Sequence, residues 1–237
     1  MAHLNHIDDR AQYAAFGLLS LGAISAIGLI SVSHPDIFQP YLGSVPPLLA
    51  VMLAAIVGYA SLRFLHAHGW EIFSAGNAMR GIAHAVMLAV PFAIAITIID
   101  VSIGFPKNLN VPLPMSLLFY PAMAYLVEIA FHVILLVLLV IALGKVLGKP
   151  GRDRLVWLCI LLVAIPEPVI QVFVPAQYRP LSWLDGYVVL HVFVFNLVEM
   201  YLFRRYDFVS MISFRLVYYL YWHIAWGYLR LNWILDV

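Results

Sequence analysis

Charged residues are scarce in this chain. Only 11% of its 237 residues are Asp, Glu, Lys or Arg, whereas soluble domains contain roughly 25%. Apolar residues make up 64%, so an ordinary soluble protein is excluded. The formal net charge is +1 and the cations are spread over short loops, without the basic patch of a nucleic-acid-binding surface. We therefore expect no nucleic-acid partner.

Cysteine is nearly absent as well. The single Cys159 lies inside an apolar run, which excludes an internal disulfide framework and a cysteine cluster for zinc. The first apolar run is about 20 residues long, longer than the core of a signal peptide, so we interpret it as a retained first helix. No separate soluble domain is visible, and we expect one integral membrane domain over residues 1–237.

Long apolar runs fill most of the chain. Each run can cross a bilayer as a helix that rises about 1.5 Å per residue. We therefore predict an all-α, polytopic transmembrane helix bundle of about seven spans in contact with the lipid bilayer. The predicted spans cover residues 13–32, 46–65, 80–103, 115–146, 154–177, 184–204 and 209–229.

The distribution of Lys and Arg predicts the orientation of the bundle. With the N-terminus in the cytoplasm, nine cations fall inside and three outside, as the positive-inside rule requires. Those inside are Arg10, Arg63, Arg80, Lys145, Lys149, Arg152, Arg154, Arg204 and Arg205, and those outside are Lys107, Arg179 and Arg230. We therefore predict a multi-pass protein of the cell membrane with a cytoplasmic N-terminus.

Four spans carry an ionisable residue at a similar depth. Counting from the cytoplasmic ends places His132, Glu167, His191 and His223 each about 20 Å into the membrane. Such groups are costly in hydrocarbon, so they tend to face the bundle interior and mark functional pathways. We therefore expect them to meet in one polar site within residues 115–230.

Two of these residues have informative neighbours. Glu128 precedes His132 by four residues, which places both on one helix face, where a carboxylate can activate water beside a proton-passing imidazole. Glu167 lies between Pro166 and Pro168, which predicts a kinked helix whose freed carbonyls need other partners. The alternative is that both Glu residues only hydrogen-bond neighbouring histidines in a closed polar core.

The last two predicted spans form an antiparallel hairpin around Asp207. Glu199 and Arg215 lie equally far from this turn along the chain, so they should be level and form a buried bidentate ion pair. Asn196 and Tyr219 lie about one turn away on the same two spans, and we expect them to support the site. The ion pair is either a structural clamp or a support for the shape of the site.

The segment V-E-I-A-F-H, from Val127 to His132, resembles a degenerate form of the E-E-x-x-F-R signature of the CPBP intramembrane proteases. This family includes CAAX-processing and bacteriocin-processing members. In it, a Glu on the fourth helix, a His on the fifth and a His followed by an Asn on the seventh form a water-activating site in the membrane. The corresponding residues here are Glu128, Glu167 and His223.

The resemblance covers roughly residues 115–230 and has departures. Val127 replaces the first Glu of the signature, His132 replaces its Arg, and Gly227 occupies the place of the Asn. A second register, E-M-Y-L-F-R from Glu199, keeps Phe and Arg but leaves only one helix downstream. We therefore favour the first register.

The resemblance implies hydrolysis of a peptide bond in a membrane-associated or prenylated substrate. Glu128 would then be the general base, and His132, His191 or His223 would orient water or stabilise the oxyanion. Glu167 would hold a histidine in one tautomer.

Other interpretations stay open. His132, His191 and His223, together with the carboxylates, suit zinc or iron, which would make the chain a His/Glu metal-binding membrane enzyme. The missing family residues favour a non-catalytic member that acts in bacteriocin immunity, in transport or as a scaffold. Haem between His191 and His223 is disfavoured, because a tight hairpin leaves too little room for the macrocycle.

Overall fold

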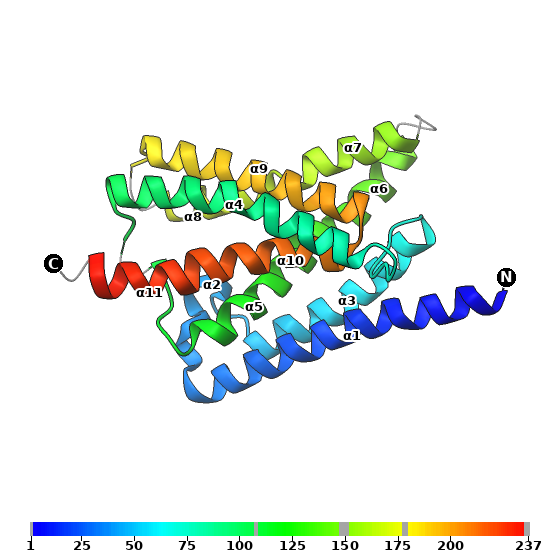
Figure 1. Cartoon of the computed structure of the whole chain (residues 1–237), viewed down its shortest axis with the longest axis horizontal. Helices are drawn as coiled ribbons and strands as arrows, with labels where there is room; N and C mark the ends of the chain where they lie inside the picture. Colours follow the sequence, from blue (N-terminus) through cyan, green and yellow to red (C-terminus); the bar gives the residue numbers. More distant parts are fainter. Residues whose placement is uncertain (1, 107–108, 147–151, 177–179, 235–237) are drawn as a thin grey trace.

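The computed structural model describes residues 2–106, 109–146, 152–176 and 180–234. Within these ranges the regular structure is entirely helical, and six helical stretches are long and apolar enough to cross a membrane. The predicted all-α polytopic bundle is therefore confirmed (Figure 1). Lys107, Lys149 and Arg179, which contributed to the predicted orientation, and Gln177, the last residue of the fifth predicted span, lie outside the described residues.

Most spans follow one another through short connections. Two of them are rods built from more than one helical piece. The six stretches are formed by α1 (Ala2–Ser33), α3 (Pro47–Ala67), α4 (Ala78–Ile103), the rod α5 (Ser116–Val127), η3 (Glu128–Ile134) and α6 (Leu135–Val146), the rod α7 (Arg152–Val163) and α8 (Pro166–Ala176), and α9 (Trp183–Arg205). The short helices η1 (Pro35–Phe38) and α2 (Gln39–Leu42) connect α1 to α3.

The seventh predicted span is helical but is not a regular α-helix. α10 (Phe208–Tyr219) continues directly into the π-helix η4 (Leu220–Trp226), then into α11 (Gly227–Leu229) and the π-helix η5 (Arg230–Ile234). In a π-helix each hydrogen bond spans five residues instead of four, so side chains after it are rotated relative to an α-helix. The rod thereby changes which residues share a face.

α10 runs through the middle of the bundle. In Figure 1, α4, α8 and α9 lie on one side of it and α1, α3 and α5 on the other. α10 packs against α4, α5 and α9. A side chain at the centre of α10 is therefore surrounded by other helices.

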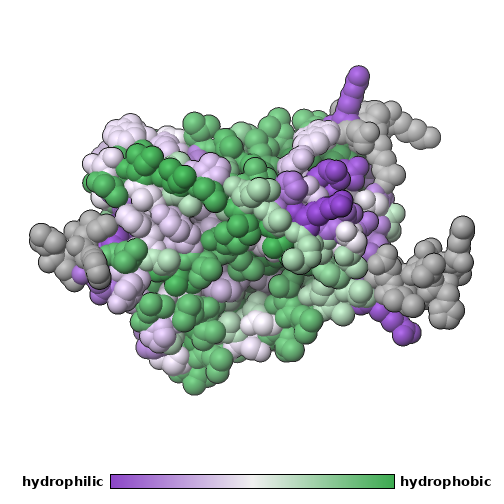
Figure 2. Space-filling model, in the orientation of Figure 1, coloured by the Kyte–Doolittle hydropathy of each residue, from purple (hydrophilic) through white to green (hydrophobic). Residues whose placement is uncertain are grey.

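The outer surface of the bundle is apolar. Leu29, Val32 and Met79 are 63%, 89% and 79% exposed. Figure 2 shows hydrophobic side chains over much of the middle of the molecule and the most hydrophilic ones toward its ends. Soluble monomers rarely expose apolar patches of this extent, whereas a lipid-facing surface requires them.

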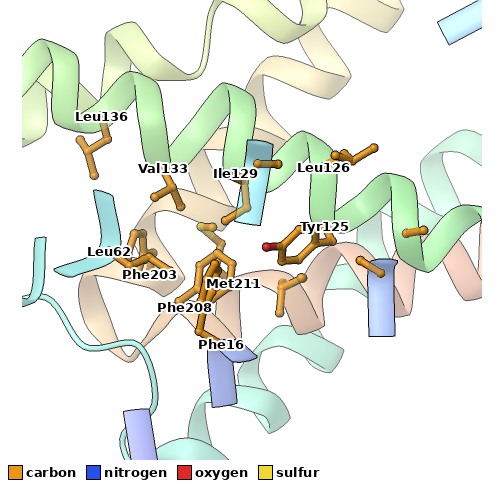
Figure 3. Packing of buried hydrophobic residues seen from close by; sticks show 14 of the residues in the cluster. Phe16, Leu62, Tyr125, Leu126, Ile129, Val133, Leu136, Phe203, Phe208 and Met211 are labelled. Carbon is orange, nitrogen blue, oxygen red and sulfur yellow. The ribbon is translucent and has the colours of Figure 1, made fainter. Parts of the chain in front are cut away.

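Buried apolar side chains form a large cluster between the helices. They come from α1, α3, the α5–α6 rod and the α9–α10 hairpin, and Figure 3 shows them meeting from these elements. The labelled members are Phe16, Leu62, Tyr125, Leu126, Ile129, Val133, Leu136, Phe203, Phe208 and Met211. This cluster holds η3 and α10 in fixed positions next to each other.

The break between α7 and α8 follows from the two prolines that predicted a kink. Pro168 has no N–H to donate to the carbonyl of Ala164. Asn196 Nδ2 on α9 donates to that carbonyl instead, at 3.3 Å. The break places Glu167 in the first turn of α8, where the helix dipole favours a carboxylate.

The turn between α9 and α10 is fixed by Asp207. Its Oδ1 accepts a hydrogen bond from the backbone N–H of Ser210 at 2.7 Å, and its Oδ2 accepts one from Ser74 at 2.8 Å. The first bond caps α10 and the second ties the hairpin to the loop before α4. This turn brings Glu199 and Arg215 to the same level, as predicted.

Gly81 lies where α4 crosses α10. A Cβ added there would lie 2.9 Å from Ser210 Cβ and 3.1 Å from Tyr206 Cβ. Ser210 cannot easily move, because its hydroxyl donates to Asp207 at 2.5 Å. We expect Gly81→Ala to lower the free energy of unfolding by about 1–3 kcal/mol, measured by denaturant unfolding in mixed micelles.

Gly22 on α1 provides the matched control, because no described heavy atom lies within 4 Å of its added Cβ. Alanine has the higher helix propensity, so Gly22→Ala should cause no loss and a gain of up to about 1 kcal/mol. Equal losses from the two substitutions would contradict the importance of close packing between α4 and α10.

Candidate functional site

Arg215 lies at the centre of a buried cluster of carboxylates. Its side chain on α10 donates to Glu128 on η3, Glu167 on α8 and Glu199 on α9. Nε lies 2.5 Å from Glu128 Oε1 and 3.0 Å from Glu199 Oε1. Nη1 and Nη2 bind the two oxygens of Glu167 at 2.8 and 2.9 Å, and Nη2 binds Glu199 Oε2 at 2.6 Å. The structure thus contains the predicted Glu199–Arg215 pair and adds two further carboxylates to it.

Neutral groups complete the surroundings of the guanidinium. Nη1 donates to the hydroxyl of Tyr219 at 3.1 Å, and Nη2 donates to Asn196 Oδ1 at 3.3 Å. Gln171 Nε2 donates to Glu167 Oε1 at 2.9 Å. Asn196 and Tyr219 therefore lie beside Arg215, where we expected supporting residues.

His132 borders the same cluster. Its Nδ1 lies 3.2 Å from Glu128 Oε2, and its Nε2 lies 3.8 Å from Glu167 Oε2 and 3.9 Å from Glu199 Oε2. Neither ring nitrogen has a hydrogen-bond partner among the described residues, and Glu128 Oε2 has none either. Buried polar atoms almost always have partners, so these three atoms are the unusual feature of the cluster.

His191 occupies a different position. Its Nδ1 lies 3.1 Å from the hydroxyl of Tyr187, and its Nε2 lies 3.1 Å from the hydroxyl of Tyr218. One nitrogen donates and the other accepts. The imidazole is therefore held in a chain of two phenols and does not contact the carboxylates.

His223 also lies apart from the carboxylates. Its ring stacks on Tyr120, with 4.2 Å between ring centroids and 12° between ring planes. Asn110 Nδ2 donates to His223 Nδ1 at 3.4 Å. Arg215, Tyr219 and His223 follow one another at intervals of four residues, and the ring of His223 still packs edge-on against Tyr219, with 4.9 Å between ring centroids and 89° between ring planes.

A cavity of about 140 Å³ joins the two histidines to the cluster. Aromatic and apolar side chains form much of its wall. The charged, amide, imidazole and phenol side chains that line it belong to Glu167, Gln171, Tyr187, His191, Arg215, Tyr218, Tyr219 and His223. Glu128, His132 and Glu199 do not line it, so the expected single polar layer is divided into a cavity and a buried cluster behind Arg215.

The residues that can hold a metal ion differ from those we expected. Within the described ranges, one group of potential ligands is close enough together: Glu128, His132 and Glu199. The expected set of His132, His191 and His223 is not brought together, because the last two histidines have aromatic partners elsewhere.

A second buried ion pair was not anticipated. Asp100, buried in the last turn of α4, accepts from Arg230 Nε at 2.8 Å and from Trp226 Nε1 at 2.8 Å. Arg230 also donates to Asn110 Oδ1 at 3.0 Å and to the carbonyl of Phe105. The one available signal was that Asp100 and Arg230 lie near the same predicted end of the bundle.

No family model, curated protein or solved structure matches this chain. The resemblance to CPBP proteases therefore rests on the motif residues alone.

Proposed function

We propose that this chain is an intramembrane hydrolase that cleaves a peptide bond of a membrane-associated substrate. The supporting observation is that Glu167 shares a cavity with Arg215, Tyr219, His191 and His223. A carboxylate, a cation and hydrogen-bonding side chains thereby surround a space of about 140 Å³. Glu167 and His191 lie on stretches long and apolar enough to cross a membrane, and the other three residues lie on the adjoining rod of α10 and η4. This combination suits activation of water and stabilisation of an oxyanion.

In this proposal Glu167 takes the role of general base that the sequence motif gave to Glu128. Glu128 does not line the cavity, whereas Glu167 does. Glu167 Oε2 accepts a hydrogen bond from Arg215 Nη2 at 2.9 Å and retains a lone pair for water. Glu128, which has His132 beside it, would instead fix the position of Arg215 from behind.

The reaction would proceed by attack of water on the scissile carbonyl. Glu167 removes a proton from the water molecule as the water oxygen forms a bond to the carbonyl carbon. The hydroxyl of Tyr219, which accepts a hydrogen bond from Arg215, can donate a hydrogen bond to the oxyanion while keeping its proton, and His223 lies on the same cavity wall. Glu167 then passes its proton to the amine as the carbon–nitrogen bond breaks.

The direct test is Glu167→Gln, which keeps the size of the side chain but removes the base. The purified chain in lipid vesicles would be given a panel of quenched fluorescent substrates, comprising farnesylated peptides and single transmembrane helices. We expect the wild type to cleave at least one of them and Glu167→Gln to lower its rate about 100-fold. Mass spectrometry of the products identifies the bond that is broken.

Glu71→Gln is the matched control, because Glu71 is exposed in the loop before α4. It should cleave at the wild-type rate. Full activity of Glu167→Gln would refute the proposed role of Glu167.

A non-catalytic function is the second candidate, and the coordination of Arg215 favours it. All three guanidinium nitrogens donate to side chains, and Glu167 is bound through both oxygens, as in a structural clamp. The chain would then serve as a membrane scaffold, immunity protein or transporter. A folded wild type that cleaves no member of the panel would support this candidate.

A further inference from the structure

The buried cluster around Arg215 carries an excess of negative charge. Glu128, Glu167 and Glu199 contribute three carboxylates, and Arg215 offsets one of them. Two negative charges therefore remain when His132 is neutral, although every one of these side chains is at most 3% exposed. Uncompensated charge in such surroundings is strongly unfavourable, so the cluster requires two further positive charges.

The atoms that lack partners show where that charge can be bound. Glu128 uses Oε1 to bind Arg215, while its Oε2 has no hydrogen bond among the described residues. Both nitrogens of His132 also lack one, although Nδ1 lies only 3.2 Å from this Oε2. Two side chains that bind the same metal ion have this arrangement: they lie close together, but no hydrogen bond joins them.

The geometry of the group agrees with a metal site. One ligand atom from each of Glu128, His132 and Glu199 lies within 4.8 Å of the other two. Bonds of about 2.0–2.2 Å to a tetrahedral ion place its ligand atoms roughly 3.4 Å apart, so small side-chain rotations suffice to close the site. Glu128 and His132 both belong to η3, and π-helical turns inside α-helices occur frequently at functional sites.

We propose that Glu128, His132 and Glu199 bind one divalent transition-metal ion behind Arg215. One imidazole nitrogen and two carboxylate oxygens suit zinc, manganese or iron(II), whereas magnesium and calcium prefer oxygen ligands alone. A divalent ion neutralises both excess charges. Its ligands do not line the cavity beside Glu167, so the metal site is separate from the proposed hydrolytic site.

Metal content tests the proposal. The chain in detergent would be stripped with a chelator, loaded with Zn²⁺, desalted and analysed by inductively coupled plasma mass spectrometry. We expect about one zinc ion per wild-type chain, and less than about one tenth of that for His132→Ala and for Glu199→Gln. His84→Ala is the matched control, because His84 is exposed on α4, and it should keep the wild-type zinc content.

A conservative variant separates loss of a ligand from loss of the fold. His132→Cys supplies another zinc ligand and should keep at least about half of the zinc, while helicity and gel-filtration elution are compared for all variants. A wild type that binds less than about one tenth of an equivalent of Zn²⁺ or Mn²⁺ would overturn the proposal and leave protons as the compensating charges. Equal zinc in the wild type and in His132→Ala would overturn it too. Because the readout is metal content, failure here is distinct from failure of peptide cleavage.

Discussion

Replacing Arg215 with methionine is expected to lower the free energy of unfolding by about 4–5 kcal/mol. Methionine keeps much of the apolar contact with Phe195, whose ring centroid lies 5.3 Å from the guanidinium carbon. It leaves Glu128, Glu167 and Glu199 buried without their shared cation, however. Loss of one partner from a buried pair costs about 3–5 kcal/mol, and here one residue serves three carboxylates. Unfolding by denaturant in mixed micelles, followed by circular dichroism, measures the loss.

Arg205→Met is the matched control for this substitution. Arg205 is exposed at the end of α9, with its guanidinium carbon 5.3 Å from the ring centroid of Tyr206, so its loss should cost less than about 1 kcal/mol. Adding Glu199→Gln to Arg215→Met should recover about 1–2 kcal/mol, because one unpaired buried charge is removed. If Arg215→Met is as stable as the wild type, the guanidinium is not the counterion that holds the cluster together.

The parts of the fold that could be predicted from the sequence depend on local chemistry. Apolar runs of membrane length predicted the helical spans, since a helix satisfies its own backbone hydrogen bonds in lipid. Pro166 and Pro168 predicted the break before α8, because a missing N–H cannot be replaced within the helix. The hairpin around Asp207 predicted that Glu199 faces Arg215, because a short antiparallel turn fixes the register of its two arms. Each inference required only neighbouring residues.

The division of the polar residues between two sites could not be predicted in this way. Counting residues from a helix end gives the depth of a side chain but not its direction around the helix axis. An α-helical stripe places Tyr219 correctly beside Arg215, and the hydrogen bond between them confirms this. The stripe continues to His223, whose ring centroid lies 4.9 Å from that of Tyr219, but it does not indicate that Glu128, His132 and Glu199 lie outside the cavity that these residues line.

The pairing of Arg215 with carboxylates on other rods could not be predicted from the sequence either. Glu128 and Glu167 come from rods that are not hairpin partners of α10 in the sequence, so no short turn fixes their lateral positions. The long side chain of Arg215 reaches both of them. Tertiary packing around the central α10 therefore decides the composition of the cluster.

Substitution of Asp100, in the other buried ion pair, is expected to cause the second large loss of stability. Asp100→Ala should lower the free energy of unfolding by about 3–4 kcal/mol in the same micelle assay. The substitution leaves the guanidinium of Arg230 buried without its carboxylate, and it removes the acceptor for Trp226 Nε1 and for the backbone N–H of Phe105. The loss should exceed that of a neutral hydrogen bond, because a buried cation remains unpaired.

A second substitution at Asp100 separates the contribution of its charge to the stability of this end of the bundle from the contribution of its hydrogen bonds. Asp100→Asn keeps one acceptor oxygen and should cost about 1.5–3 kcal/mol, less than Asp100→Ala. Asp36→Ala is the matched control: Asp36 is exposed on η1, so its change should stay within about 0.5 kcal/mol. Arg230 keeps the acceptors Asn110 Oδ1 and the carbonyl of Phe105 in every variant. A loss of stability that is specific to Asp100→Ala therefore measures the contribution of the Asp100 carboxylate. Equal stability of Asp100→Ala and Asp36→Ala would mean that these remaining acceptors suffice for the guanidinium.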